Sequence, residues 1–239
     1  MKISLIIPAY NEEKYIKACL ESVSRAILPN GQLAEIIVVD NASTDRTAEV
    51  AKNFPKVRVV SEKEKGLTKA RARGLLESSG DIIAYIDGDT RVGIGWFQKI
   101  IDEFESDSEL VCLSGPYRYY DLGRFDTLLV KFYWNILALP IYFLLGYMVV
   151  GGNFAAKKSA LEAIGGFDKN INFYGEDTNI ARRLHRHGKV KFSTSFPMET
   201  SARRFRSEGL LRIAFTYALN FAGEVIFHRS LTKVYKDVR

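Results

Sequence analysis

The chain has 239 residues, 47% of them hydrophobic and 26% charged, which is enough for one large domain with a sizeable core, or one domain with appendages. Its two cysteines, Cys19 and Cys112, do not have the spacing of a metal or redox motif, so we expect two buried thiols and a reducing compartment. The net charge is +6, and residues 200–239 supply most of it, with eight Lys or Arg and three Asp or Glu. This basic segment indicates an acidic partner, such as phosphates or a lipid surface.

Strands and helices alternate along the first half of the chain. Apolar runs predict buried strands at residues 3–7, 35–39, 57–60, 82–86 and 111–114. Helical spacing and N-cap residues predict helices at residues 12–23, 67–77 and 95–104, and another from Ser43-Thr44-Asp45 to about residue 53. The alternation predicts an α/β fold with a mostly parallel central sheet and helices on both faces. Neither a Walker-type loop nor G-x-G-x-x-G follows the first strand, which disfavours a P-loop NTPase and a dinucleotide oxidoreductase.

The most informative motif is Tyr85-Ile86-Asp87-Gly88-Asp89-Thr90, which follows the predicted strand 82–86. Strand ends in an open α/β sheet face the crevice where ligands bind. Two carboxylates one residue apart suit a hard divalent cation, which prefers oxygen ligands and usually also binds substrate phosphates. The alternative is a tight turn in which Gly88 supplies a positive φ. The neighbouring motifs favour the ligand site.

Polar residues follow two other strands. Residues 8–12 end the first strand, where Tyr10 could stack on a base or simply cover the sheet edge. Asp40 ends the second strand and could accept hydrogen bonds from a base or a ribose, or cap the next helix. The helix 67–77 carries basic residues that could face a diphosphate or form a solvated face: Lys69, Arg71 and Arg73.

Taken in order, these segments resemble the family-2 glycosyltransferases of the GT-A fold over roughly residues 1–205. The matching segments are Pro8-Ala9-Tyr10-Asn11-Glu12, Val38 to Asp45, Gly66 to Gly74, Tyr85 to Asp89, Gly151-Gly152-Asn153, Gly165-Gly166-Phe167-Asp168, and Gly175-Glu176-Asp177-Thr178. Each motif is weak alone, but seven in order form a strong signal.

The resemblance implies a set of roles. The donor nucleotide sugar is expected to contact Pro8, Ala9, Tyr10, Glu12, Asp40, Lys69, Arg71, Asp87, Arg203 and Arg204. Mg²⁺ or Mn²⁺ is expected at Asp89 and Asp87, and the acceptor at Gly151, Gly152 and Asn153. The catalytic base is expected in the pair Glu176-Asp177, with Asp177 the first choice and Glu176 the second. The alternative for this pair is an acidic first turn that favours its helix.

The chain departs from the family pattern at several positions. Asn41 and Ala72 stand where the family often has Asp and Asn, and residues 199–201 offer no His as a further metal ligand. The Gln-x-x-Arg-Trp signature of processive polymerases is absent, which favours transfer of a single sugar. Ser201-Ala202-Arg203-Arg204-Phe205 occupies similar ground, and its guanidinium groups, with that of Arg206, suit phosphate oxygens.

Two apolar stretches stand out. Residues 132–150 include sixteen apolar residues among nineteen and could just cross a bilayer, but the acidic motifs before and after them must meet on one side. We therefore expect helices that pack on the domain or enter the membrane interface, with a break at Pro140. Residues 210–227 form a helix with one narrow polar stripe and a broad apolar face that we expect to be buried, followed by a basic end. That pattern is typical of a membrane-surface anchor, but also of a helix packed on the domain or on a second copy.

The sequence thus predicts an α/β fold of GT-A type with apolar C-terminal helices. Its catalytic domain covers residues 1–205, with a nucleotide-sugar half (1–115) and an acceptor half (116–205) that includes the apolar segment 122–150; residues 206–239 form an apolar helix and a basic tail. We expect an inverting, metal-dependent hexosyltransferase that moves one sugar from a UDP- or GDP-sugar to a hydroxyl or phosphate.

The acceptor is expected to be lipid-linked, and a soluble acceptor is the alternative. The start of the chain has no signal-peptide pattern, which predicts a cytoplasmic protein, peripheral at the inner face of the cell membrane and able to form a homodimer. A sugar nucleotidyltransferase is a rival, although it should carry a Gly-rich, Arg-containing loop after the first strand. A nucleic-acid-binding module is disfavoured because the basic residues form no stripe with aromatic residues.

Overall fold

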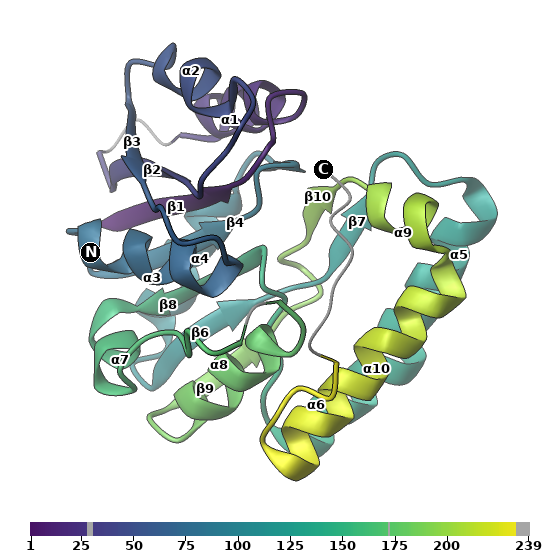
Figure 1. Cartoon of the computed structure of the whole chain (residues 1–239). Coiled ribbons are helices and arrows are strands. Elements are labelled where there is room, and N and C mark those ends of the chain that lie inside the picture. Colours follow the sequence, from purple (N-terminus) through teal and green to yellow (C-terminus); the bar gives the residue numbers. More distant parts are fainter. Residues whose placement is uncertain (28–30, 172, 233–239) are drawn as a thin grey trace.

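The computed structural model describes residues 1–27, 31–171 and 173–232, apart from the side chain of Leu211. Most of the predicted basic tail, with Lys233, Lys236 and Arg239, lies outside the described residues. The described chain forms a central seven-stranded sheet covered by helices, and a pair of long helices that extend to one side of it (Figure 1).

The central sheet is mostly parallel, as predicted. Its strands lie in the order β3-β2-β1-β4-β8-β6-β9, and β8 runs antiparallel to both of its neighbours. Their bounds are β1 (Ile3–Ala9), β2 (Leu33–Asp40), β3 (Val57–Ser61), β4 (Ile82–Ile86), β6 (Leu110–Ser114), β8 (Asn153–Lys157) and β9 (Lys189–Phe192). Strand β1 is buried along its whole length because helices cover both faces of the sheet.

The two faces of the sheet have separate apolar cores. Because side chains alternate along a strand, Ile3, Leu5 and Ile7 of β1 enter one core while Ile6 enters the other. The first core is shared with α1 (Ile16–Ala26) and α4 (Trp96–Ser106), next to which lies α2 (Thr47–Lys52). The second core is shared with α3 (Leu67–Glu77), α7 (Lys158–Ala163) and α8 (Glu176–His185).

A second, three-stranded sheet connects distant parts of the chain. Its strands are β5 (Thr90–Arg91), β10 (Met198–Thr200) and β7 (Tyr117–Tyr119), with β10 in the middle. Thr200 pairs with Thr90 across β10 and β5. This pairing brings the residues after β10 next to the end of β4, although more than a hundred residues separate them in the sequence.

The predicted elements of the first half are confirmed, with shifts at their ends. Strand β4 and helix α3 have the predicted bounds, whereas α1 begins at Ile16 rather than at residue 12. The N-cap position of α2 is Arg46, which makes no side-chain cap hydrogen bond, so the predicted cap lies one residue too early. Asp45 accepts hydrogen bonds from the backbone N–H and the hydroxyl of Thr47, the first residue of the helix. Both cysteines are free and buried, as expected.

The apolar segment forms one long helix instead of two broken ones. It consists of α5 (Arg124–Phe132), a π-helical stretch η1 (Tyr133–Ala138) and α6 (Leu139–Leu145). The predicted break at Pro140 is wrong, because the proline falls in the first turn of α6, directly after the π-helical stretch, where its missing N–H is tolerated. This 124–145 helix is long and apolar enough to cross a membrane, and only 6% of its most apolar 18-residue stretch is buried in the protein.

The second apolar stretch is the helix α10 (Leu210–Phe227), which follows the short helix α9 (Arg203–Glu208). Its orientation differs from the prediction: the C-terminal half of the polar stripe turns inward, so that Asn220 and Glu224 are buried while Phe215 and Ile226 are about two-thirds exposed. Arg212, at the start of the stripe, is exposed. Asn220 accepts hydrogen bonds from the backbone of residues 231 and 232, and Glu224 lies against α8. The apolar face of α10 therefore points away from the core.

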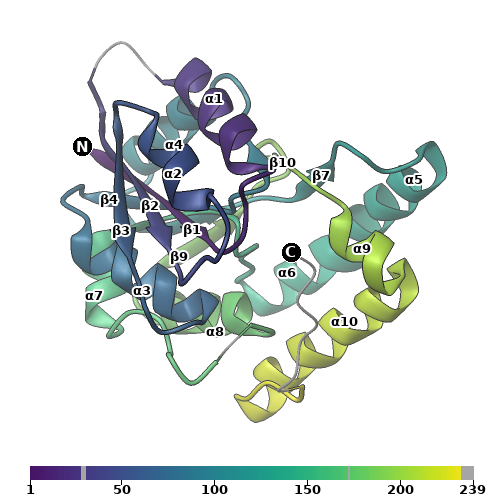
Figure 2. The ribbon, with the colours of Figure 1, turned by 45° about the horizontal axis from the view of Figure 1, so that its top comes forward.

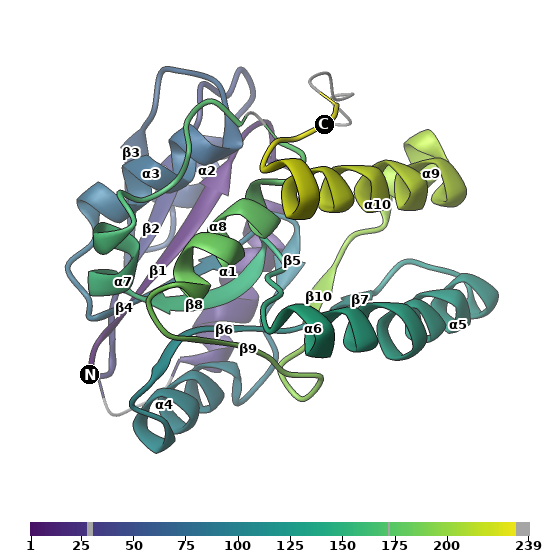
Figure 3. The same cartoon turned by 90° about the horizontal axis from the view of Figure 1, so that it is seen from below.

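The 124–145 helix and α10 lie on the same side of the molecule, beyond β7 and β10. Figure 2 shows them away from α1, α2 and α3, and Figure 3 shows that they run along one another with α8 near α10. This arrangement gives the protein two long, outward-facing apolar surfaces next to the carboxyl-end side of the sheet.

Candidate active site

The candidate site is built at the carboxyl ends of β1 and β4, which are parallel neighbours. Glu12 follows β1, and Asp87 and Asp89 follow β4. Glu12 is almost completely buried, Asp89 is largely buried, and one-third of the Asp87 side chain is exposed. The sequence correctly places these three carboxylates at neighbouring strand ends.

Arg71 connects the end of β4 with the start of α8. Its side chain is only 1% exposed, and its terminal nitrogens pair with Glu176 and, at 3.2 Å, with Asp87. The expected contact with the donor does not fit this position, because the guanidinium group is buried among the carboxylates instead of facing solvent. Arg71 is a counter-ion that holds the Asp-x-Asp turn and the start of α8 together.

Arg203 enters the site from the C-terminal part of the chain. Its Nη1 and Nη2 atoms pair with the two carboxylate oxygens of Glu12 at 2.7 and 2.5 Å, and its Nε lies 2.9 Å from Asp89 Oδ2. Its guanidinium group also lies 4.8 Å from the ring centre of Tyr15. Arg203 is thus at the predicted site, where it contacts carboxylates of both strand ends.

Glu176 and Asp177 form the first turn of α8, after Gly175, whose φ of +84° suits glycine. Burial raises the pKa of Glu176 to about 7, while the nearby Arg71 guanidinium acts in the opposite direction. Asp177 is half-buried, and burial raises its pKa above the ordinary value although its Oδ1 accepts a hydrogen bond from the Thr178 backbone N–H. Glu176 is therefore engaged by Arg71, and Asp177 is the more accessible carboxylate.

A small hollow lies beside the end of β1. It is lined by Pro8, Ala9, Tyr10, Asn41, Lys65, Gly66, Leu67, Ala70 and Phe173. Lys65 Nζ lies 3.8 Å from the centre of the Tyr10 ring. Asp40 lies opposite Ala9 in the sheet, and its Oδ1 accepts a hydrogen bond from the backbone of Ser43. Pro8, Ala9 and Tyr10, which are predicted to contact the donor, therefore line this hollow, and Asp40 lies at the neighbouring strand end. Glu12 is instead paired with Arg203.

Asn41 has a structural task in this region. Its Nδ2 donates to the backbone oxygens of Glu62 and Glu64, and its Oδ1 accepts from the N–H of Gly66. These bonds fix the loop between β3 and α3. The departure from the family pattern at this position thus sets the shape of the loop that borders the hollow.

The predicted acceptor residues have other roles in the fold. Asn153 is fully buried, accepts a hydrogen bond from Trp96 Nε1, and donates to the backbone oxygens of Gly115 and Phe196. Its side chain cannot contact an acceptor in this arrangement, so that prediction is corrected. A Cβ at Gly151 would collide with Glu176 and Arg71, and one at Gly152 with Asp87 and Tyr117. The two glycines let the backbone approach the site closely.

The remaining basic residues lie at the edges of the candidate site. Lys69 pairs with Glu64 at 2.9 Å, and Arg204 pairs with Glu208 at 3.0 Å and lies over the ring of Phe173. Arg73 pairs with Glu77 on the surface, and Arg206 pairs with Asp121. Arg203, one of the guanidinium groups predicted for the donor, is paired with Asp89.

Sequence reasoning missed two residues of the site. The Tyr117 hydroxyl donates to Asp87 Oδ2 at 2.9 Å, and burial together with Asp87 raises the pKa of this tyrosine. Asp121 accepts hydrogen bonds from Ser201 Oγ and the Ala202 N–H, so it fixes the start of α9. Neither residue stands in a motif, and only the pairing of β7 with β10 brings them to this position.

The carboxylates of the site fit a divalent cation that is bound jointly by the protein and a substrate. Within the described residues, no group of three or more His, Cys, Asp or Glu side chains could hold a metal ion alone. Asp87 and Asp89 offer hard carboxylate oxygens, and Mg²⁺ usually binds one or two carboxylates together with substrate phosphates and water. The residues present therefore match a shared ion rather than a site made by protein alone.

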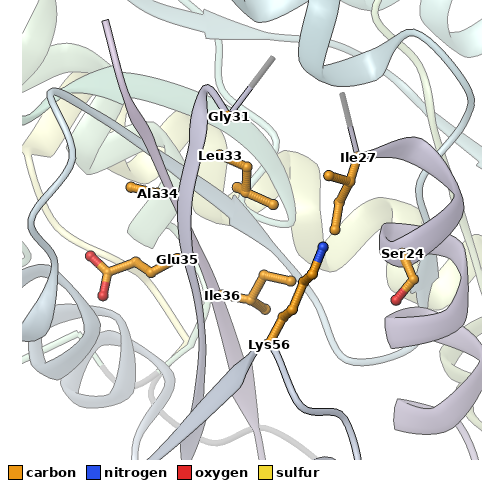
Figure 4. A pocket seen from close by; sticks show the side chains of 8 residues that line it. All are labelled: Ser24, Ile27, Gly31, Leu33, Ala34, Glu35, Ile36 and Lys56. Carbon is orange, nitrogen blue, oxygen red and sulfur yellow. The ribbon is translucent and has the colours of Figure 1, made fainter. Parts of the chain in front are cut away.

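A different hollow lies at the opposite edge of the sheet. Figure 4 shows Lys56 between Ile27 and Ile36, close to the start of β2. Glu35 points away from these residues, and its carboxylate pairs with Arg58. This hollow is at the amino ends of β2 and β3, so it does not belong to the candidate site.

Replacing Arg71 should reveal how much the fold depends on it. In Arg71→Met, Glu176 stays buried without its guanidinium partner, and breaking a buried ion pair typically costs about 3–5 kcal/mol. We expect this loss in urea unfolding at pH 8. It should be smaller at pH 5.5, because a carboxyl group whose folded pKa is raised destabilises the fold only as pH rises and it ionises.

The matched control is Arg73→Met on the same helix, which removes an exposed pair and should change stability by less than about 1 kcal/mol. Adding Glu176→Gln to Arg71→Met should restore part of the loss. Equal stability of the Arg71 and Arg73 variants at pH 8 would contradict a structural role for the buried pair.

The fold is that of the GT-A class, and comparisons with known proteins agree. Residues 4–165 match the sequence model described as glycosyl transferase family 2. This chain belongs to that family. It spans about a third to a half of the length of the first curated relatives it matches.

Similar proteins include a curated relative and two solved structures. Dolichol-phosphate mannosyltransferase of Pyrococcus furiosus is 33% identical over 131 residues, which are 53% of this chain and 36% of the relative. The mannosyltransferase PcManGT from Pyrobaculum calidifontis, in complex with GDP-Man and Mn²⁺, has a TM-score of 0.71 at 20% identity and covers 95% of this chain and 64% of its own. Glucosyl-3-phosphoglycerate synthase from Mycobacterium tuberculosis, in complex with Mn²⁺, UDP and phosphoglyceric acid, has a TM-score of 0.65 at 21% identity and covers 95% and 78%.

Proposed function

We propose that this protein transfers one sugar from a UDP- or GDP-sugar to an acceptor, with inversion at the anomeric carbon. The observation that carries the proposal is a pair of ion-pair clusters that the Asp87-Gly88-Asp89 turn connects: Arg71 with Asp87 and Glu176, and Arg203 with Glu12 and Asp89. Together they join the donor-binding strand ends to the start of α8, where Asp177 lies. Two solved proteins of this fold, bound to GDP-Man or to UDP, support a nucleotide-sugar donor.

Each part of the site has a task in this reaction. The hollow beside Tyr10 holds the nucleoside, and Asp40 accepts hydrogen bonds from its polar edge. Asp87 and Asp89 would hold Mg²⁺ or Mn²⁺, which acts as a Lewis acid and neutralises charge on the leaving diphosphate. Tyr117 and Arg71 fix the orientation of Asp87 through hydrogen bonds to both of its oxygens.

Asp177 is the proposed general base. Its carboxylate takes the proton of the acceptor hydroxyl while that oxygen attacks the anomeric carbon from the face opposite the diphosphate. A single displacement of this kind inverts the centre and needs no covalent nucleophile. Glu176 is less suited, because Arg71 already pairs with it in a buried position.

The proposed donor can be tested by thermal melting of the whole chain with UDP, GDP, ADP and CDP, each with and without Mn²⁺. A ligand that binds only the folded state raises the melting temperature by mass action. Stabilisation by one diphosphate that requires Mn²⁺ supports the proposal. Stabilisation only by a nucleoside triphosphate together with a sugar phosphate would instead favour the nucleotidyltransferase.

We further propose that the acceptor is lipid-linked and that the protein binds the cytoplasmic surface of the membrane. The support is an exposed apolar surface on two helices, here called the two-helix face. Its side chains are Phe125, Leu128, Phe132, Ile136, Leu137, Phe143 and Leu144 of the 124–145 helix and Phe215, Ile226 and Phe227 of α10. Monomeric soluble proteins rarely expose apolar patches of this kind.

The position of the two-helix face suits an acceptor that comes from a membrane. Tyr133 on the first helix and Tyr217 on α10 both lie within electrostatic range of Asp177, and burial raises the pKa of both phenols. Each of the two helices thus has an aromatic ring near enough to the proposed base to be affected by its charge. Basic residues at their ends, Arg124 and Arg212, and the basic segment after α10 would favour anionic lipids. The similarity to a dolichol-phosphate mannosyltransferase supports an isoprenoid-linked acceptor.

Vesicle flotation provides the test for membrane binding. We expect the full chain to float with vesicles that contain anionic lipid, with partial loss at high salt, because both charge and apolar burial contribute. Phe215→Glu with Ile226→Glu should abolish flotation, because it places charges on the exposed face of α10 without changing the buried half of its polar stripe.

The matched control is Leu76→Glu, which charges an equally exposed leucine on α3, away from the two-helix face. It should float like the unmodified chain. If the unmodified chain stays in solution as a dimer, the two-helix face is a subunit interface. If it stays in solution as a monomer, a soluble acceptor becomes the better proposal.

A further inference from the structure

The guanidinium group of Arg203 bridges two carboxylates that come from different strands. Glu12 takes both terminal nitrogens in a fork, whereas Asp89 takes only the Nε. The three side chains are well shielded from solvent: 13% of Arg203, 2% of Glu12 and 11% of Asp89 are exposed. Arg203 therefore occupies a position directly on the carboxylate that the Asp-x-Asp motif offers to a cation.

The two contacts of Arg203 are unequal. A bidentate pair of guanidinium and carboxylate has two parallel hydrogen bonds and a fixed geometry. The contact of Nε with Asp89 is a single ion pair, so it can break while the fork with Glu12 remains. A small rotation about the fork would release Asp89 without leaving Glu12 unpaired.

The backbone under Arg203 is fixed, so a change in this contact would be made by the side chain. Asp121 accepts hydrogen bonds from Ser201 Oγ at 2.9 Å and from the Ala202 N–H at 2.6 Å, directly before Arg203. Arg206 pairs with the same carboxylate at 2.7 Å. These contacts hold the first turn of α9 in place while the long side chain of Arg203 keeps its rotatable bonds.

From this geometry we infer that Arg203 is an exchangeable counter-ion of the metal-binding carboxylate. It neutralises Asp89 until a divalent cation binds there. It then keeps its fork with Glu12 and directs its Nε–H to the diphosphate of the donor. The inference rests on the proposed function, and it adds that Arg203 competes with the metal and cooperates with the donor.

The exchange follows from the cost of leaving charges buried and unpaired. Asp89 needs a positive partner in a shielded site, and an unpaired buried charge is strongly destabilising. A metal ion that takes Asp89 must displace Arg203, so binding of the metal alone is weakened. A donor diphosphate gives the released Nε–H a new acceptor, so metal and donor strengthen each other's binding, and by linkage they do so equally.

Arg203→Met separates these two roles, because it removes the charge but keeps an unbranched side chain. We expect Mn²⁺ to bind this variant about tenfold more tightly than the unmodified chain in the absence of nucleotide, and the nucleoside diphosphate to bind about tenfold more weakly at saturating Mn²⁺; tenfold lies within the usual range for coupled sites. Free Mn²⁺ is measured by electron paramagnetic resonance, and the nucleotide by calorimetry.

The matched control is Arg58→Met, which removes a guanidinium group that also bridges two carboxylates, Glu35 and Glu77, but lies away from the candidate site. Both affinities should stay within about twofold of the unmodified chain. Arg203→Lys keeps the charge but loses the fork, so its affinities for Mn²⁺ and for the nucleotide should lie between those of the unmodified chain and those of Arg203→Met. If Arg203→Met does not fold, the Lys variant still has to show tighter Mn²⁺ and weaker nucleotide binding.

The outcomes distinguish this inference from the proposed function. If the unmodified chain binds neither Mn²⁺ nor any nucleoside diphosphate, the proposed function is wrong. If it binds both, but Arg203→Met changes neither affinity or weakens both, the exchange is wrong and the proposed function stands. Opposite changes in the two affinities are the signature that a merely structural arginine would not give.

Discussion

Asp89→Ala should abolish sugar transfer and the Mn²⁺-dependent binding of the donor, while the chain stays folded. Asp89 is the second carboxylate of the Asp-x-Asp motif and offers a hard oxygen to the shared cation. Its removal leaves the fork between Arg203 and Glu12 in place, so the buried guanidinium group keeps a partner. Turnover of a nucleotide sugar and calorimetry with the diphosphate and Mn²⁺ measure the two effects.

The control for this variant is Asp102→Ala, which removes an exposed carboxylate of α4 whose Oδ1 accepts a hydrogen bond from Gln98. It should retain full activity and the unmodified melting temperature. Full turnover by Asp89→Ala, or by the unmodified chain in excess chelator, would refute metal use at this position.

Asp177→Asn should lower turnover by about 10²–10⁴-fold, the usual contribution of a general base. The donor affinity should remain, because Asp177, at the start of α8, does not line the hollow beside β1. An asparagine oxygen can accept the same hydrogen bond from the Thr178 backbone, so the turn should keep its shape. Single-turnover rates and donor affinity give the two measurements.

The comparison with Glu176→Gln decides between the two acidic residues. If Glu176→Gln is inactive and stable while Asp177→Asn is active, the roles are exchanged. A pH profile adds an independent readout: the unmodified chain should lose turnover as pH falls and Asp177 becomes protonated, at a pH above that of an ordinary aspartate because burial raises its pKa. Asp177→Asn should lack this acidic limb.

The sequence predicts the sheet and the acidic motifs well because their signals are local. The apolar run before Asp87 and strand β4 both end at Ile86, and the Glu176-Asp177 pair begins α8 as the helix-start pattern indicates. The role of Arg71 was not predictable in the same way. The prediction grouped Arg71 with Lys69 and Arg73, but residues two apart do not share a helix face. The structure accordingly buries Arg71 and leaves Arg73 partly exposed, and the partner of Arg71 on α8 lies far away in the sequence.

The other differences have long-range causes. A proline normally interrupts a helix, but the π-helical stretch before Pro140 changes the pattern of backbone hydrogen bonds there. A sequence pattern does not reveal this change. The C-terminal half of the polar stripe of α10 turns inward because α8 and residues 230–232 offer partners to Asn220 and Glu224. Asn153 belongs to a matching motif, but its amide binds two distant backbone oxygens, which only the complete fold brings together.

The pair formed by Glu12 and Arg203 also bears on how the chain folds. These residues are 191 positions apart, whereas Arg71 and Asp87 are 16 apart. Closing the longer loop costs roughly 2 kcal/mol more in chain entropy, by the logarithmic dependence on loop length. Contacts of such high sequence separation slow folding, because the chain loses conformational entropy in closing the loop before the stabilising contacts form. The parallel strands β1 to β4 can thus assemble from the first ninety residues, but the site is complete only when the segment after β10 has returned to them.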